Sequence, residues 1–212
     1  MTLASIVLLA AAAQAIRPVT RRALDTEPAA LALPAKATFV EQRCSPEFIE
    51  RDLRLPTLKR TMTLTQAFGA ARGAAKDAPD AGDRTGTYGW PGGDSLAYYL
   101  ARHPEIVKKK RILELGCGTG AVGIVCSWLG ATKVLLTDGS PIVLETTRRN
   151  LKTNRASRAS LQRLRWGYDD DLAKAQPGSW DLVVAAEVAY QRETLPAFLA
   201  TVSALLKDDG LA

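Results

Sequence analysis

The stretch Arg111-Ile-Leu-Glu-Leu-Gly-Cys-Gly-Thr-Gly120 joins a short apolar run to a loop with a glycine at every second position. The apolar run, residues 111–115, has the length and composition of a buried strand. The glycines are expected to end that strand in a tight turn, because glycine adopts backbone conformations that other residues avoid. Apolar residues then recur at helical spacing, so a helix is expected over residues 119–129.

The same alternation of strand and helix continues along the chain. Strands are expected at residues 111–115, 133–137, 161–166 and 181–186, and helices at residues 95–102, 119–129, 140–154 and 195–207. Ser140 and Pro141 suit the start of the third helix as its N-cap and first residue. Parallel strands need crossover connections, and these crossovers cover the sheet. The sequence therefore predicts an α/β fold, a parallel sheet with helices on both faces.

Ligands of such sheets bind beyond the carboxyl ends of the strands, where the glycine loop and Asp138 lie. Gly116, Gly118 and Ala121 also match a dinucleotide-binding fingerprint, in which Asp138 would bind a ribose. Glu114 favours another ligand, because a carboxylate beside the loop repels a pyrophosphate and suits an ammonium group. S-adenosylmethionine carries an ammonium and a sulfonium and no phosphate. We therefore expect S-adenosylmethionine as the cofactor, with Asp138 accepting hydrogen bonds from both ribose hydroxyls.

Four segments resemble one family in their order along the chain. Residues 114–120 resemble motif I of the seven-β-strand, S-adenosylmethionine-dependent methyltransferases. Residues 85–91 (TGTYGWP), 165–167 (RWG) and 185–190 (AAEVAY) are similar to further segments of methyltransferase family 16, the non-SET protein-lysine methyltransferases. Glu187 stands where that family usually has Asp, which keeps the charge and moves the carboxylate outward by one methylene. The resemblance covers roughly residues 62–212 and implies a Rossmann-like class I methyltransferase fold.

Site residues follow from the strand ends and from this resemblance. The resemblance implies that Trp166 lies near the adenine and that Trp90 closes the pocket, although either could be a core aromatic residue. Glu187 and Tyr190 are the expected catalytic residues. The expected cofactor-binding residues are Trp90, Glu114, Gly116, Cys117, Gly118, Gly120, Asp138, Trp166 and Ala186.

The resemblance also implies the reaction, transfer of a methyl group to a lysine side-chain amine of a protein. A lysine with a pKa near 10.4 must first lose its proton, and methyl transfer itself depends mostly on positioning. We expect Glu187 to hold the incoming ammonium. Tyr190 is expected to face it as an aromatic wall, and desolvation beside the sulfonium would lower the pKa of the lysine.

Scarce residue types exclude several kinds of site. His103 is the single histidine of the chain, so a multi-histidine metal site is excluded and no metal is expected. Cys44, Cys117 and Cys126 match no zinc-binding spacing, and an odd number of cysteines suits a reducing compartment. These residues favour a cytoplasmic protein.

The net charge of +6 leaves other functions open. A nucleic-acid methyltransferase would use the basic residues at 108–111 and 148–165, but the segment after residue 184 lacks the Asn/Asp-Pro-Pro-aromatic motif of methylation at planar nitrogens. We therefore expect no nucleic-acid substrate. The alternatives to a protein-lysine methyltransferase are a nucleic-acid or small-molecule methyltransferase and an inactive cofactor-binding fragment.

The 212 residues are expected to divide into three parts. Residues 1–40 predict a leader and linker, in which residues 1–15 end like a signal-peptidase site and offer a secretory or organelle-targeted alternative. Residues 41–104 predict an extension with one strand at 58–68, a loop at 70–83 and the first helix. Residues 105–212 predict the cofactor domain. No sequence is expected to remain for a fifth strand, which would leave residues 182–186 as an exposed edge.

Overall fold

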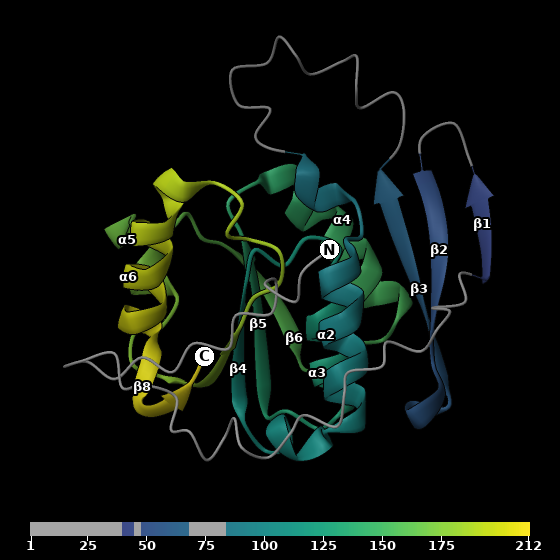
Figure 1. The fold of residues 1–212 in the computed structure, drawn as a ribbon, viewed down its shortest axis with the longest axis horizontal. Coiled ribbons are helices and arrows are strands. Elements are labelled where there is room, and N and C mark those ends of the chain that lie inside the picture. Colours follow the sequence, from purple (N-terminus) through teal and green to yellow (C-terminus); the bar gives the residue numbers. More distant parts are fainter. Residues whose placement is uncertain (1–39, 45–47, 68–83) are drawn as a thin grey trace, which may run out of the picture.

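The computed structural model describes residues 40–44, 48–67 and 84–212. Its centre is a five-stranded, all-parallel sheet in the order β6-β5-β4-β7-β8 (Figure 1). The chain winds outward from β4 in one direction and then crosses to the other, which makes the sheet doubly wound. The predicted parallel sheet of an α/β fold is confirmed. The strands are β4 (Arg111–Leu115), β5 (Lys133–Asp138), β6 (Ala159–Arg163), β7 (Trp180–Val184) and β8 (Leu206–Leu211).

Helices cover both faces of this sheet (Figure 1). On one face lie α2 (Pro91–Arg102), α3 (Ala121–Trp128) and α4 (Pro141–Thr153), and on the other α5 (Asp169–Lys174) and α6 (Leu195–Leu205). Side chains along β4 point alternately to the two faces of the sheet, and each face has its own hydrophobic core. Ile112 packs in the core with α3, and Leu113 packs in the core with α6. Short 3₁₀ turns lie at Pro56–Leu58, Thr85–Thr87, Pro104–Ile106 and Arg192–Thr194.

A three-stranded antiparallel sheet lies beside α4, in the order β1 (Val40–Cys44), β2 (Phe48–Leu55) and β3 (Arg60–Ala67) (Figure 1). The predicted strand at 58–68 corresponds to β3, whereas β1 and β2 were not predicted. Arg51 shares the buried face of β2 with Leu53 and Leu55. A charged residue at a core position breaks the apolar alternation, so β2 has no clear strand pattern in the sequence.

Two asparagines, Asn150 of α4 and Asn154 at the C-cap of that helix, hydrogen-bond the edge of β3. Asn154 exchanges hydrogen bonds with Thr63 at 3.0 and 2.7 Å, and Asn150 exchanges them with Thr65 at 2.7 and 3.0 Å. The Asn150 amide also donates to the Thr119 carbonyl of the glycine loop at 2.9 Å. The two side-chain amides pair with backbone groups of β3, as the backbone of a neighbouring strand would. They join the antiparallel sheet to the cofactor domain.

We expect Asn150→Ala to lower the free energy of unfolding by about 3 kcal/mol, because it leaves backbone groups of the buried residues Thr65 and Thr119 without these partners. Urea unfolding followed by circular dichroism measures the change. Lys152→Ala, at an exposed position of the same helix, is the control and is expected to change it by less than about 0.5 kcal/mol. Equal stabilities for both variants would contradict this account of the α4 contact.

The predicted exposed edge at 182–186 is wrong. Helix α6 ends at Leu205, and β8 pairs in parallel with β7, so Leu182 is fully buried. The Asp-Asp-Gly sequence at 208–210 is typical of a turn, but here Gly210 lets β8 pass close to β7. A Cβ on Gly210 would lie 3.0 Å from the Trp180 carbonyl and 2.7 Å from the Leu206 side chain.

Other expectations differ in smaller ways or are not tested. The first helix begins at Pro91 because proline fits the first helical position. Helix α5 was not predicted, and the strand expected at 161–166 lies at Ala159–Arg163. The leader and linker of residues 1–40, apart from residue 40, and the loop at 70–83 lie outside the described residues. No helix in the described part of the chain has the length and apolar character that a membrane span requires.

Candidate active site

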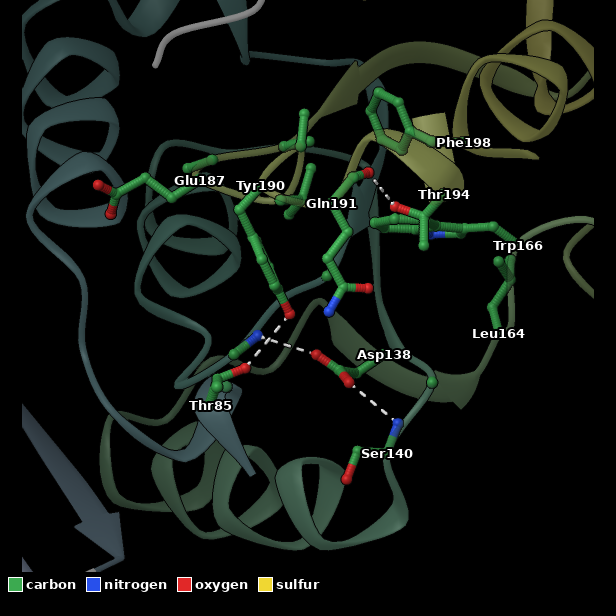
Figure 2. A pocket seen from close by; sticks show the side chains of 18 of the residues that line it. Thr85, Asp138, Ser140, Leu164, Trp166, Glu187, Tyr190, Gln191, Thr194 and Phe198 are labelled. Atoms are coloured by element: carbon green, nitrogen blue, oxygen red, sulfur yellow. Dashed lines mark hydrogen bonds between the residues drawn. The ribbon is translucent and has the colours of Figure 1, made fainter. Parts of the chain in front are cut away.

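A cavity of about 690 Å³ opens at the carboxyl ends of β4, β5 and β7. The loops after these strands, the segment after β6 and the segment before α2 form its walls (Figure 2). The structure brings eight of the eleven predicted site residues to this cavity: Trp90, Gly116, Gly118, Asp138, Trp166, Ala186, Glu187 and Tyr190. Its size lies within the range of roughly 300–1,000 Å³ that small-molecule sites occupy.

Glu114, Cys117 and Gly120 do not line this cavity. Cys117 is buried, and its sulfur lies 3.8 Å from the Thr147 hydroxyl. Gly120 precedes α3 in the left-handed region (φ 82°), where a Cβ would lie 2.7 Å from the Thr147 side chain. Cys117 and Gly120 lie on the side of the loop that packs against Thr147 of α4, and they do not line the cavity where a ligand would lie.

Gly116 and Gly118 form the part of the loop that faces the cavity. Both have left-handed φ values, 67° and 53°. A Cβ on Gly116 would lie 2.6 Å from a Val188 methyl group, and one on Gly118 would lie 3.2 Å from the Gly86 carbonyl. The loop therefore requires glycine at both positions, and it offers bare backbone to a ligand.

Asp138 joins two walls of the cavity. One of its carboxylate oxygens accepts a hydrogen bond from the Ser140 amide at 3.0 Å, and the other accepts one from the Gly118 amide at 3.3 Å (Figure 2). The Ser140 hydroxyl is buried and has no hydrogen-bond partner among the described residues. Since buried hydroxyls are normally hydrogen-bonded, this atom is a candidate partner for a polar ligand group beside Asp138.

The two tryptophans have different surroundings. Trp166 is partly buried and meets Phe198 edge to face, with ring centroids 4.9 Å apart, so it both packs on the core and forms a cavity wall. Trp90 is 51% exposed at the mouth, and its indole N–H donates to the Thr85 carbonyl at 3.0 Å. Trp90 is therefore not a core aromatic residue, which was the alternative left open by the sequence.

Glu187 and Tyr190 diverge from the end of β7 (Figure 2). Glu187 has a left-handed backbone (φ 55°), and its carboxylate accepts the Gly92 amide of the first turn of α2 at 2.9 Å. Tyr190 extends across the cavity, where its hydroxyl lies 3.4 Å from the Thr85 hydroxyl. A non-glycine residue in the left-handed region is uncommon and clusters at functional sites.

Glu114 lies on the α3 face of β4, one strand repeat from Ile112. Its carboxyl accepts the Gly123 amide at 2.9 Å and is buried under α3. Burial raises the pKa of Glu114 to about 8, with a smaller increase from the charge of Asp138. The alternation of β4 therefore explains why this acid lies beneath the loop and not in the cavity.

This raised pKa of Glu114 predicts a pH effect on stability. The folded chain holds a proton that the unfolded chain releases near pH 4.5, so the stabilisation is complete below that pH and is lost as the pH rises toward 8. From pH 5 to pH 8 we expect wild type to lose on the order of 3 kcal/mol relative to Glu114→Gln, which does not titrate. Thermal unfolding of both proteins measures this loss, and parallel pH profiles would contradict the account.

Sequence reasoning missed five polar residues of the cavity: Thr85, Ser140, Arg165, Gln191 and Thr194. Ser140 is the N-cap residue of α4 as predicted, but its side chain makes no capping hydrogen bond, and its hydroxyl is buried beside the cavity wall. Its position two residues after a strand end was the available signal. Gln191 extends toward Asp138 in Figure 2, and no sequence pattern marks it.

The sheet order, the glycine loop and the acid at the end of β5 fit a Rossmann-like methyltransferase, the class that uses S-adenosylmethionine. A family model described as lysine methyltransferase matches residues 78–211. The chain belongs to that family. This confirms the resemblance found in the sequence.

Curated relatives carry related names. The chain is 29% identical over 190 residues to protein-lysine N-methyltransferase EFM3 of Chaetomium thermophilum, covering 82% of this chain and 52% of the relative. It is 35% identical to protein N-lysine methyltransferase METTL21A of Danio rerio (57% and 55% covered) and 32% identical to EEF1A lysine methyltransferase 3 of Mus musculus (70% and 58% covered). The chain thus spans little more than half the length of these relatives.

Proposed function

We propose that this protein transfers a methyl group from S-adenosylmethionine to a lysine side-chain amine of a protein substrate. The observation that carries the proposal is the cavity at the strand ends, which combines bare glycine backbone, the Asp138 carboxylate and an aromatic mouth. Membership of the lysine methyltransferase family and the names of the relatives support the choice of substrate.

The cavity residues fit the cofactor. Asp138 and the Ser140 hydroxyl would bind the ribose hydroxyls, since a carboxylate accepts two hydrogen bonds and the buried hydroxyl has no partner among the described residues. Gly116 and Gly118 would let the methionine part approach the backbone. Trp166 would lie against the adenine ring. When bound, S-adenosylmethionine supplies an electrophilic methyl group on a cationic sulfur.

Glu187 and Tyr190 would handle the lysine. Glu187 supplies a negative charge at the cavity wall beside α2, which would attract the lysine ammonium, and Tyr190 supplies an aromatic wall with a hydroxyl acceptor. Trp90 and Tyr190 are both more than half exposed, so a side chain from another protein can reach the mouth between them. Exclusion of water there would lower the pKa of the lysine and favour its neutral, nucleophilic form.

A labelled-methyl assay on a cell lysate separates this function from methylation of nucleic acid. Exposed basic residues of α4, Arg148, Arg149 and Lys152, make RNA the alternative to test. We expect the transferred label to survive ribonuclease and to disappear with protease. Label that ribonuclease removes would contradict a protein substrate.

The cytoplasmic location and the three-part organisation at residues 1–40, 41–104 and 105–212 belong to the same proposal. The free thiols of Cys117 and Cys126 support a reducing compartment. Cell fractionation of the tagged protein tests the location, and recovery in a membrane-enclosed organelle would favour targeting by residues 1–15.

A further inference from the structure

The first turn of α2 is held from two sides. On one side, the Glu187 carboxylate accepts the Gly92 amide at 2.9 Å. On the other side, Asp94 receives two hydrogen bonds from Arg51 of β2, at 2.5 and 2.7 Å. Strand β2 belongs to the antiparallel sheet, outside the sheet that carries the cavity, yet Arg51 bonds to the turn that directly follows Trp90.

The Arg51–Asp94 pair is buried and closely fitted. The side chains are 5% and 10% exposed, and the paired guanidinium and carboxylate meet through two parallel contacts, a geometry that Lys cannot reproduce. The guanidinium also lies directly beneath Gly89, where a Cβ would be only 2.0 Å from an Arg51 nitrogen. Arg51 therefore contacts the chain on both sides of Trp90, at residues 89 and 94.

Trp90 depends on its segment for its position. Its side chain is 51% exposed, and its indole N–H donates to Thr85, five residues earlier in the same segment. Because about half of Trp90 is exposed, its place at the mouth depends largely on where residues 85–94 lie. From the antiparallel sheet, Arg51 contacts this segment at Gly89 and Asp94.

We infer that Arg51 is a positioning residue for the cofactor site, acting through Asp94 and Gly89 to hold Trp90 over the cavity. This inference rests on the cofactor binding in the proposed function. The antiparallel sheet would then have a role in cofactor binding, because Arg51 of β2 would position Trp90 at the mouth of a cavity that the parallel sheet forms. Removal of the pair is expected to weaken cofactor binding and to leave the rate of methyl transfer nearly unchanged.

The test compares Arg51→Met/Asp94→Asn with Arg54→Met, an exposed arginine of the same strand. The double variant is used because Arg51→Met alone would leave a buried carboxylate unpaired. We expect about tenfold weaker binding of S-adenosylhomocysteine, a KM for S-adenosylmethionine raised by a similar factor and a kcat within about twofold of wild type. Arg51→Lys is expected to be intermediate, and Arg54→Met unchanged.

Hydrogen exchange supplies a measurement that needs no cofactor. Amides of residues 88–96 are expected to exchange at least about tenfold faster in the double variant, while those of α3 keep their wild-type rates. In a Trp90→Ala background the double substitution should cause no further loss of affinity, because Arg51 acts through Trp90.

Wild-type exchange at residues 88–96, wild-type affinity, or a full additional loss in the Trp90→Ala background would each overturn the inference. If wild type itself fails to bind S-adenosylhomocysteine, the proposed function fails, and with it the cofactor role of Arg51. If wild type binds the cofactor and no lysine is methylated, only the proposed substrate fails.

Discussion

Asp138→Ala is expected to weaken the binding of S-adenosylhomocysteine by about 100-fold or more. Hydrogen bonds to a charged group contribute about 1.5–3 kcal/mol each, and the carboxylate would accept two from the ribose. A 100-fold loss corresponds to about 2.7 kcal/mol. The substitution also removes the acceptor for the Ser140 and Gly118 amides, so the two walls of the cavity lose their connection.

Isothermal titration calorimetry measures this affinity, and circular dichroism checks that the variant is folded. Asp138→Asn is the matched control, because it keeps the shape and one acceptor oxygen and is expected to fall between wild type and Asp138→Ala. Ser140→Ala removes the buried hydroxyl alone and is expected to weaken binding by less than tenfold. An Asp138→Ala affinity within threefold of wild type would contradict the placement of the ribose.

Glu187→Ala is expected to lower kcat for lysine methylation by about 100-fold, in line with the loss of a positioned charged group at the reacting atoms. The carboxylate also bonds to the Gly92 amide, so loss of rate alone does not separate its charge from its contact with α2. Glu187→Gln separates the two, because the amide oxygen can still accept that hydrogen bond while the charge is lost.

We expect Glu187→Gln to lower kcat nearly as much as Glu187→Ala while keeping the wild-type affinity for S-adenosylhomocysteine. Single-turnover rates and titrations measure the two quantities. Wild-type kcat in Glu187→Gln together with a slow Glu187→Ala would assign Glu187 to holding α2, and would remove it from the handling of the lysine.

The parallel sheet was predictable from sequence because β4, β5 and β7 are buried on both faces and appear as nearly continuous apolar runs. The rule that ligands bind beyond such strands selects Asp138 and the glycine loop from the sequence alone. Strand β2 was missed because Arg51 occupies a core position. Strand β8 was missed because the last helix was expected to run to residue 207, whereas α6 ends at Leu205. Both depend on partners distant in sequence, Asp94 and Trp180.

The sequence predicted which residues form the site better than it predicted the directions of their side chains. The period of a strand already places Glu114 on the same face as Ile112, so its burial beneath α3 could have been derived from the sequence. The direction of Glu187 could not, because it depends on a left-handed backbone and on an amide of α2, nearly a hundred residues earlier in the chain. Tertiary contacts of this kind leave no local pattern.

The measurement that tests the central claim most directly is amino-acid analysis of labelled protein. Lysate incubated with this protein and methyl-labelled S-adenosylmethionine is hydrolysed in acid, and the labelled products are separated beside methylated standards. The account predicts label in N-methylated lysine, lost with Asp138→Ala. Label in methylarginine, methylhistidine or nucleosides, or labelling that Asp138→Ala leaves unchanged, would contradict it.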